Sequence, residues 1–359
     1  MHIDEINENQ DPHLTPEPAD TSLPIENQEG EQTVSPTSPW TQSRIDLSPL
    51  KLASEQIRHE LQKVIIGQTE FIDLLLSALF AGGHVMVEGV PGIAKTLTAK
   101  LMAQTLEVDF SRIQFTPDLM PSDVIGTTVF NMQTSEFSFN EGPVFANFVL
   151  IDEINRAPAK TQAALFEVME EHQVTVDGQT YPMSFPFFVM ATQNPIEQEG
   201  TYKLPEAQLD RFLVKINLDY PSLSEEMAIL QRFRNDFKVD HKKVAQVFSA
   251  EQLQACQALV EQVHIKDELL QYIANITHNT RNNGDLFLGA SPRASLSILK
   301  MAKATAAMAG RDFVTPDDIQ YVAYPVLNHR IILTPEREME GFSTKDVIKD
   351  IIQKIEVPR

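Results

Sequence analysis

The stretch that decides the fold is HVMVEGVPGIAKT, residues 84–96. It begins with a short apolar run containing β-branched valines, which predicts a buried strand. A loop with two glycines and a proline follows, and Lys95 and Thr96 open a stretch with helical character. Backbone N–H groups in such a loop converge on an anion, and the positive end of the helix dipole adds to the attraction. The stretch therefore predicts a phosphate-binding loop between a strand and a helix.

Two side chains of this loop have specific expected roles. Lys95 would reach the β- and γ-phosphates of a nucleotide, and the Thr96 hydroxyl would bind Mg²⁺. The position before the lysine, usually glycine, is Ala94 here. That change matters little if Ala94 has a helical φ and matters greatly if its φ is positive. The residues of this stretch that we expect around ATP are Gly89, Val90, Pro91, Gly92, Ile93, Ala94, Lys95, Thr96 and Leu97.

Polar residues end two further apolar runs. Residues 148–153, FVLIDE, place Asp152 and Glu153 after a predicted strand, and 191–195, ATQNP, place Asn194 after another. Ligands of open α/β sheets bind at the carboxyl ends of strands. Asp152 can then hold Mg²⁺ opposite Thr96, Glu153 can polarise an attacking water, and Asn194 can position it. Taken alone, an Asp-Glu pair is also typical of a helix N-terminus, and Asn before Pro is typical of a turn.

Two arginines follow turn signals later in the chain. Arg211 lies in LPEAQLDRF, 204–212, and Arg293 lies in GASPR, 289–293. A guanidinium on the γ-phosphate stabilises the charge that spreads during phosphoryl transfer. Taken alone, each arginine is more typical of a surface salt-bridge partner.

The order of elements predicts an α/β fold with a mainly parallel sheet sandwiched by helices, because strands alternate with helices up to Tyr220. Two hairpins interrupt the alternation, at 128–139 and at 174–181, where Asp177-Gly178 suits a type I′ turn. After Pro221 the strand signals stop, and a smaller, all-helical domain is predicted. We therefore expect a disordered acidic tail over 1–43, a nucleotide-binding domain over 44–221 and a helical lid over 222–359.

Composition excludes several classes of protein. The 359 residues carry 29 Lys and Arg against 50 Asp and Glu, a net charge of −21, which argues against general affinity for nucleic acid. The single cysteine, Cys256, excludes an internal disulfide framework. No apolar run reaches about 18 residues, so no membrane span is predicted, and the acidic N-terminus does not resemble a secretory signal. We expect a cytoplasmic protein.

Several long motifs, in this order, resemble those of the MoxR family of AAA+ ATPases, from about Leu50 to the C-terminus. The segments are GVPGIAKT (89–96), FTPDLMPSDVIGT (115–127), EGPVFANFVLIDEINRAPAKTQAALFEVMEEHQVTVDG (141–178), ATQNPIEQEGTYKLPEAQLDRF (191–212) and GASPRA (289–294). The family's fold is an AAA+ P-loop core followed by a helical lid. Ala94 before Lys95 is typical of the family.

The resemblance implies a role for each candidate residue. Lys95 and Thr96 match the Walker A pair and Asp152 and Glu153 the Walker B pair. Asn194 matches sensor 1, Arg293 sensor 2, and Arg211 the arginine finger that acts on a neighbouring subunit's nucleotide. The segment 66–68, with Gly67, resembles the one beside the adenine base, and the two hairpins resemble insertions that face a central pore.

The resemblance also implies partners. An arginine finger serving a neighbour needs a head-to-tail interface, and such interfaces close into rings, here a homo-oligomer that is a hexamer in this family. ATP and Mg²⁺ are the implied cofactors. The implied work is chaperone-like remodelling or activation of a protein client, such as metal-cofactor insertion or complex maturation, often with a von Willebrand factor A domain protein.

Three other functions stay open at this point. One is a nucleic-acid motor similar to the MCM helicases, although the hairpin tips offer acids and amides where DNA-tracking hairpins need basic residues. Another is a magnesium-chelatase-like subunit. The third is a slow nucleotide-dependent switch or scaffold, against which the full set of catalytic residues argues.

Overall fold

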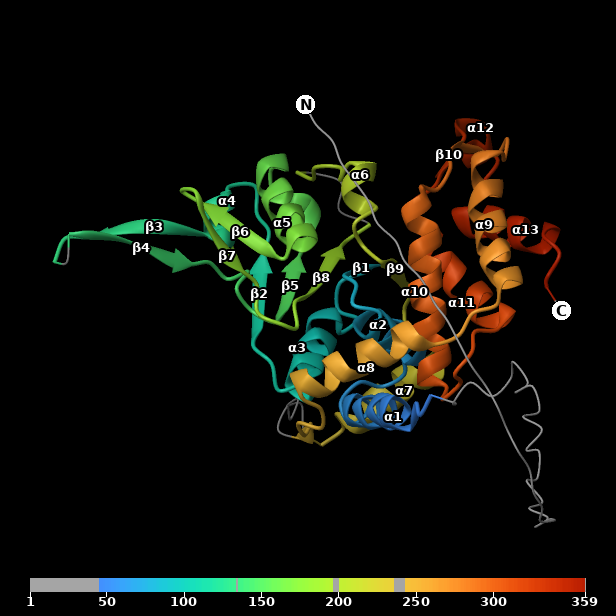
Figure 1. The fold of residues 1–359 in the computed structure, drawn as a ribbon, viewed down its shortest axis with the longest axis horizontal. Coiled ribbons are helices and arrows are strands. Elements are labelled where there is room, and N and C mark those ends of the chain that lie inside the picture. Colours follow the sequence, from blue (N-terminus) through green and yellow to red (C-terminus); the bar gives the residue numbers. More distant parts are fainter. Residues whose placement is uncertain (1–44, 134, 196–199, 236–242, 359) are drawn as a thin grey trace, which may run out of the picture. The chain divides into compact units, whose positions relative to one another are not determined.

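The computed structural model describes residues 45–133, 135–195, 200–235 and 243–358, which belong to one compact unit. The predicted tail at 1–43 lies outside the described residues. At the centre is a five-stranded sheet in the order β2-β5-β8-β1-β9, with every neighbouring pair parallel (Figure 1). Its strands are β1 (Val85–Gly89), β2 (Phe110–Gln114), β5 (Phe148–Asp152), β8 (Phe188–Gln193) and β9 (Val214–Leu218). The sequence did not predict β9, which is the short strand at one edge.

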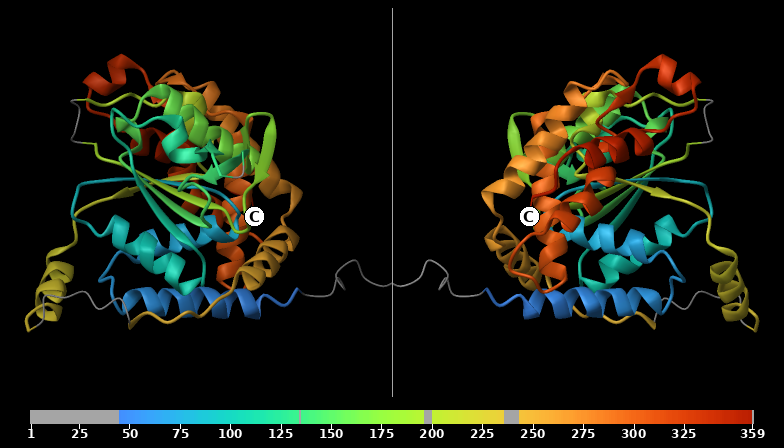
Figure 2. Two further views of the ribbon diagram at one scale, coloured as in Figure 1. Left: turned by 90° about the vertical axis from the view of Figure 1, so that its left-hand side faces the viewer. Right: turned by 90° about the vertical axis from the view of Figure 1, so that its right-hand side faces the viewer.

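Alternation along the buried strands separates the core into two layers. Val85 and Val87 pack into the cluster formed with α1, α2 and α3, whereas Met86 packs into the cluster formed with α4 and α5. Figure 2 shows the sheet between these helical layers. The helices are α1 (Ser48–Gln62), α2 (Thr69–Phe80), α3 (Lys95–Thr105), α4 (Pro121–Ile125) and α5 (Ala159–Glu171), with a 3₁₀ turn at Ile154–Arg156 and the short α6 (Glu206–Leu209). The predicted fold class is confirmed.

Both predicted hairpins form. β3 (Gly126–Asn131) pairs with β4 (Glu136–Glu141), and Figure 1 shows this hairpin extending away from the central sheet. β6 (Gln173–Val176) pairs with β7 (Gln179–Pro182), and Asp177 and Gly178 both have positive φ, of 51° and 78°. The residue pair that favours positive φ therefore makes the turn that the sequence predicted.

The C-terminal part is helical apart from a small antiparallel sheet of β10 (Leu286–Leu288) and β11 (Ile332–Leu333). Its helices are α7 (Leu223–Arg232), α8 (Ala250–Gln262), α9 (Asp267–Arg281), α10 (Pro292–Met308), α11 (Pro316–Leu327), α12 (Pro335–Met339) and α13 (Thr344–Lys354). Thr315 caps α11, and the Asp318 carboxylate accepts a hydrogen bond from the Thr315 backbone N–H at 2.8 Å. This capping box fixes the start of the helix.

α10 joins this part to the rest of the chain, because it packs against α2 as well as against α8, α9 and α11. The domain boundary near residue 221 stays a prediction. Among the described residues, no helix is long and apolar enough to cross a membrane.

Candidate functional site

The phosphate loop connects β1 to α3 and lines a cavity of about 390 Å³. At its centre the Lys95 ammonium donates a hydrogen bond of 2.5 Å to the Gly89 carbonyl. Around this loop the chain brings together most of the residues predicted to act on a nucleotide. The cavity is lined by Pro91, Gly92, Ala94, Lys95, Thr96, Leu97, Asp152, Glu153, Thr192 and Asn194.

The two residues that shape the loop have positive φ. Gly92 has a φ of 88°, and a side chain added there would meet no atom within 4 Å, so the loop is open above it. Ala94 has a φ of 60° and precedes the first residue of α3. This is the case in which the missing glycine matters, because an L-residue in the left-handed region is strained by roughly 1–2 kcal/mol. The strained residue, Ala94, is therefore the one directly before Lys95.

Asp152 and Thr96 lie together at the carboxyl end of β5. The Thr96 Oγ1 is 3.5 Å from the Asp152 Oδ2. The Thr192 hydroxyl, on β8, donates to the Asp152 Oδ1 at 2.6 Å. Arg112, on β2, donates to the Asp152 Oδ2 through Nη2 at 2.7 Å. The carboxylate is thus held from both neighbouring strands.

Glu153 is held in a similar way by residues that the sequence did not single out. Gln114 donates to its Oε2 at 2.9 Å, and the Arg156 Nε lies 3.0 Å from the same oxygen. The backbone N–H of Glu153 donates to the Thr192 hydroxyl at 3.1 Å. Glu153 itself has a φ of 57°, a left-handed conformation that turns the chain sharply after β5. Thr192, buried between the two acids, therefore fixes both of them.

Lys95 is partly buried beside three carboxylates. Burial lowers the pKa of its ammonium, while Asp152, Glu153 and Glu88 act in the opposite direction. Opposite charges close to a cation favour its charged form. These three carboxylates therefore favour the charged form of an ammonium whose burial disfavours it.

The 66–68 segment contacts the phosphate loop, and its place beside the adenine base stays a prediction. The Gln68 side-chain amide donates to the Ile93 carbonyl at 2.9 Å, and its buried Oε1 has no hydrogen-bond partner among the described residues. Gly67 has a φ of 69°, and a side chain there would collide with the Glu225 carboxylate on α7. A buried acceptor without a donor is costly, so this amide oxygen is a candidate partner for an amino group of a bound base.

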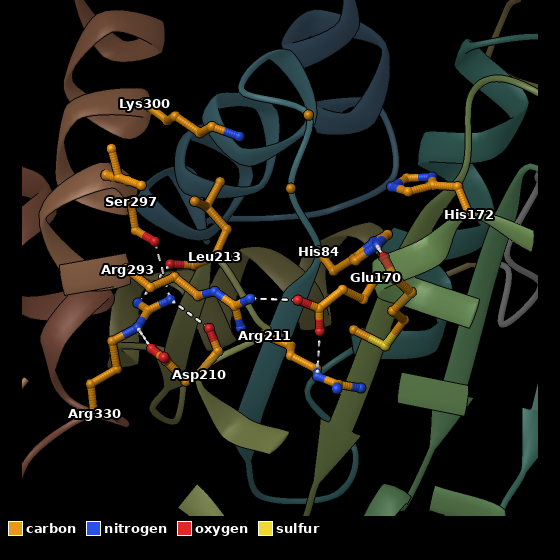
Figure 3. A pocket seen from close by; sticks show the side chains of 14 residues that line it. His84, Glu170, His172, Asp210, Arg211, Leu213, Arg293, Ser297, Lys300 and Arg330 are labelled. Atoms are coloured by element: carbon orange, nitrogen blue, oxygen red, sulfur yellow. Dashed lines mark hydrogen bonds and ion pairs between the residues drawn. The ribbon is translucent and has the colours of Figure 1, made fainter. Parts of the chain in front are cut away.

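The two predicted arginines lie elsewhere, and neither lines the phosphate-loop cavity. Arg211, after α6, and Arg293, at the start of α10, both line a second cavity of about 260 Å³. Glu170, at the end of α5, pairs with both of them. Its Oε2 is 2.7 Å from the Arg211 Nε, and its Oε1 is 2.5 Å from the Arg293 Nη2. Figure 3 shows the two guanidinium groups meeting different oxygens of this carboxylate.

The residues that the sequence analysis missed have weak sequence signals. Thr192 lies on β8, two positions before Asn194, and buried polar residues in an apolar run are uncommon enough to notice. Arg112 and Gln114 are two positions apart on β2, so both side chains lie on the same face of the sheet. Nothing in the sequence alone marked Glu170, because its partners lie 41 and 123 residues away along the chain.

Comparison with known proteins agrees with this geometry. Residues 84–214 match the model of the ATPase family associated with various cellular activities, and residues 278–351 match the AAA lid domain. The chain is 45% identical over 313 residues to the protein YeaC of Bacillus subtilis, covering 87% of this chain and 96% of the relative. It is 44% identical over 314 residues to Chaperone MoxR1 of Mycobacterium tuberculosis, covering 85% and 82%.

A crystal structure of a Cytophaga hutchinsonii protein superimposes with a TM-score of 0.81 at 43% identity, covering 87% of this chain and 97% of that one. Relatives of this identity, matched over most of both chains, share the fold and the order of motifs. The chain belongs to the MoxR family of AAA ATPases.

Proposed function

We propose that this chain hydrolyses ATP and uses the cycle to remodel or activate a partner protein. The observation that carries the proposal is the grouping of Lys95, Thr96, Asp152, Glu153 and Asn194 around one cavity behind a phosphate loop. Lys95 and Thr96 begin α3 after the loop that follows β1, and Asp152, Glu153 and Asn194 lie at the carboxyl ends of β5 and β8, where open α/β sheets bind their ligands.

Thr96 and Asp152 are the residues that would hold Mg²⁺. Their oxygens lie 3.5 Å apart. Mg²⁺ commonly binds one or two protein oxygens together with substrate phosphates and water, and this donor set fits that preference. The ion would neutralise charge on the phosphate oxygens.

Glu153 is the proposed general base. A base must reach the attacking water within hydrogen-bond distance, and Glu153 lines the cavity from the end of β5. Its carboxylate is engaged by Gln114 and Arg156, which fix its direction. Asn194, from the neighbouring strand β8, is proposed to position the water. Lys95 would leave the Gly89 carbonyl for the phosphates, because a phosphate oxygen is the stronger acceptor.

Arg211 and Arg293 are proposed to act on the nucleotide of a neighbouring subunit. Both line the cavity that contains Glu170, and neither lines the cavity of its own phosphate loop, so action at another subunit's site fits their position. A head-to-tail contact of this kind closes into a ring, which we propose to be a hexamer.

The work is proposed to be done on a protein client. The chain's relative named Chaperone MoxR1 supports this direction. The two hairpins carry no Lys or Arg over 126–141 and 173–182, which disfavours nucleic acid as the substrate. We propose that the client has a von Willebrand factor A domain, and that its maturation includes metal insertion or assembly of a complex.

The test uses the full chain and its Glu153→Gln variant. The wild type should hydrolyse ATP with Mg²⁺, and the variant should bind ATP within about twofold of wild type while turnover falls by at least about 100-fold. Equal loss of binding and turnover would contradict the role of Glu153.

The same variant, held in its ATP-bound state, is suited to capture the client by pull-down. Recovery of a von Willebrand factor A domain protein supports the proposed partner. Clear stimulation of wild-type ATPase by single-stranded DNA at moderate salt would favour the nucleic-acid motor instead.

A further inference from the structure

Arg330 lies just after α11 in the C-terminal part, and the proposed function gives it no role. Its guanidinium makes a dense set of hydrogen bonds to other described residues. Its side chain is only 2% exposed. It donates to the Asp210 carboxylate at 2.7 Å and to the Ser297 hydroxyl at 3.1 Å. It also donates to the backbone carbonyls of Asp210, Phe212, Leu213 and Val326.

The two residues before Arg330 hold the same segment. The Asn328 amide donates to the Lys215 carbonyl at 3.0 Å, and the His329 Nε2 lies 3.2 Å from the Phe212 carbonyl oxygen. Residues 328–330 are all buried. They therefore clamp the backbone from Asp210 to Lys215, the segment that begins beside Arg211.

Asp210 also connects Arg330 to the segment that carries Arg293. One of its carboxylate oxygens accepts from Arg330, and the other accepts from the Ser291 hydroxyl at 2.8 Å. Ser291 caps α10, two residues before Arg293, and Asp210 is the residue before Arg211. In Figure 3, Arg330 and Asp210 lie on one side of the Arg293 guanidinium, and Glu170 lies on the other side. One carboxylate thus connects the backbone at both arginines to a buried guanidinium.

A buried ion pair is often no more stabilising than apolar side chains of the same volume, because the cost of desolvation offsets much of the attraction. Its strength is geometric: a planar guanidinium with five N–H donors fixes each partner in direction as well as in distance. Here the partners include the Asp210 carboxylate and the Asp210 and Phe212 carbonyls, which belong to the residues on either side of Arg211.

We propose that Arg330 is a positioning residue that, through Asp210 and Ser291, sets the separation and orientation of Arg211 and Arg293. This rests on the proposed function, because it assumes that the two arginines act on a neighbouring subunit's nucleotide. Arg330 contacts neither substrate nor metal. Its effect is transmitted through the 210–213 segment and the cap of α10.

The first measurement compares Arg330→Gln, Asp210→Asn and Ser291→Ala. We expect kcat to fall about 10–100-fold, about tenfold and about twofold, respectively, with ATP binding kept within about twofold, since only transition-state contacts are misplaced. Arg337→Gln is the matched control. Arg337 is also an arginine of the C-terminal part, paired with Asp285 at 2.8 Å and Glu340 at 2.6 Å, and its loss should leave kcat within about twofold.

The decisive measurement is rescue in mixed assemblies. An Arg330→Gln subunit keeps its own phosphate loop and Glu153, and a Glu153→Gln subunit keeps well-placed arginines. Mixing these two impaired proteins in equal amounts should raise turnover to about one quarter of wild type if sites act independently. One neighbouring pair in four joins a subunit that has an intact phosphate loop and Glu153 to a subunit that has well-placed arginines. A purely structural defect in Arg330→Gln would give no rescue.

A parallel mixture of Arg211→Ala with Glu153→Gln tests action between subunits separately from the positioning role of Arg330. If this mixture regains activity and the Arg330→Gln mixture does not, the positioning role is overturned while the proposed function stands. If neither mixture regains activity, action between subunits is itself wrong. Should Arg330→Gln fail to fold, as judged by thermal unfolding, Asp210→Asn takes its place in the mixture and the same outcomes decide.

Discussion

The Arg112 guanidinium lies 2.7 Å from the Oδ2 of Asp152, the oxygen that also faces Thr96. The carboxylate proposed to hold Mg²⁺ is therefore paired with a cation from the neighbouring strand before any metal binds. Arg112 is half exposed and Asp152 is mostly buried, with side-chain exposures of 50% and 14%. The pair places a half-exposed positive charge where a divalent ion is expected.

Arg112→Ala should lower the Mg²⁺ concentration needed for half-maximal ATPase. Removing the competing cation frees the carboxylate, and a partly exposed pair is worth at most about 1 kcal/mol, so the shift should not exceed about fivefold. The measurement is ATPase rate against free Mg²⁺ at saturating ATP, with Arg58→Ala as a control at an ion pair remote from the cavity. A higher Mg²⁺ requirement would mean that Arg112 orients Asp152 for the ion.

Glu170→Gln should favour assembly. Glu170 neutralises Arg211 and Arg293, which must leave it to reach a neighbour's phosphate. Weakening this partly exposed pairing should lower the protein concentration for half-maximal ATPase about two- to fivefold. ATPase rate measured against protein concentration tests this, and Glu171→Gln, one residue along, is the control. A rise in that concentration would show instead that Glu170 holds the arginines in their working geometry.

Ala94→Gly should stabilise the chain without nucleotide. Ala94 has a φ of 60°, which glycine adopts without strain, although glycine also adds freedom to the unfolded chain. The two effects leave a net gain of up to about 1 kcal/mol in the free energy of unfolding. Urea denaturation measures it, with Ala99→Gly inside α3 as the control, which should lose about 1 kcal/mol. If Ala94→Gly lowers the free energy of unfolding as Ala99→Gly does, Ala94 is not strained.

Stability should fall as the pH drops below about 6.5, because His84 is buried and neutral. Burial lowers the pKa of His84 to about 4, and its Nδ1 accepts a hydrogen bond from the Val189 N–H at 3.0 Å. The unfolded chain therefore binds more protons between these pH values, and folding becomes less favourable on acidification. Its contribution is a loss of about 2 kcal/mol from pH 7 to pH 5. His84→Gln should flatten the pH dependence of urea denaturation, and an unchanged slope would refute this.

The exposed hydrophobic side chains of the β3–β4 hairpin should matter for work on a client but not for basal ATPase. Phe137 is 74% exposed and Phe130 is 46% exposed, and their ring centroids lie 5.0 Å apart. Such a solvent-facing aromatic pair is suited to contact unfolded polypeptide. The double change to serine should leave basal turnover within about twofold and remove stimulation by β-casein, an unfolded protein, whereas Gln133→Ala should keep both. Retained stimulation would place the client contact elsewhere.

The sequence by itself determined the elements whose physics is local. The phosphate loop, the strand ends at Asp152 and Asn194 and the Asp177-Gly178 turn each depend on residues within a few positions of one another. The pattern of apolar runs was enough to predict a parallel sheet and a helical C-terminal part. β9 was missed because Lys215 and Asn217 interrupt its apolar residues and because it pairs with β1, which lies more than 120 residues earlier.

Only the tertiary structure decided how the charged side chains pair. Arg112, Thr192 and Glu170 gain their partners by strand pairing and helix packing, which no local pattern encodes. The positive φ of Ala94 and the pairing of Arg211 with Arg293 through Glu170 likewise follow from the folded backbone. Electrostatic partners are set by distance in space, and a sequence gives only distance along the chain.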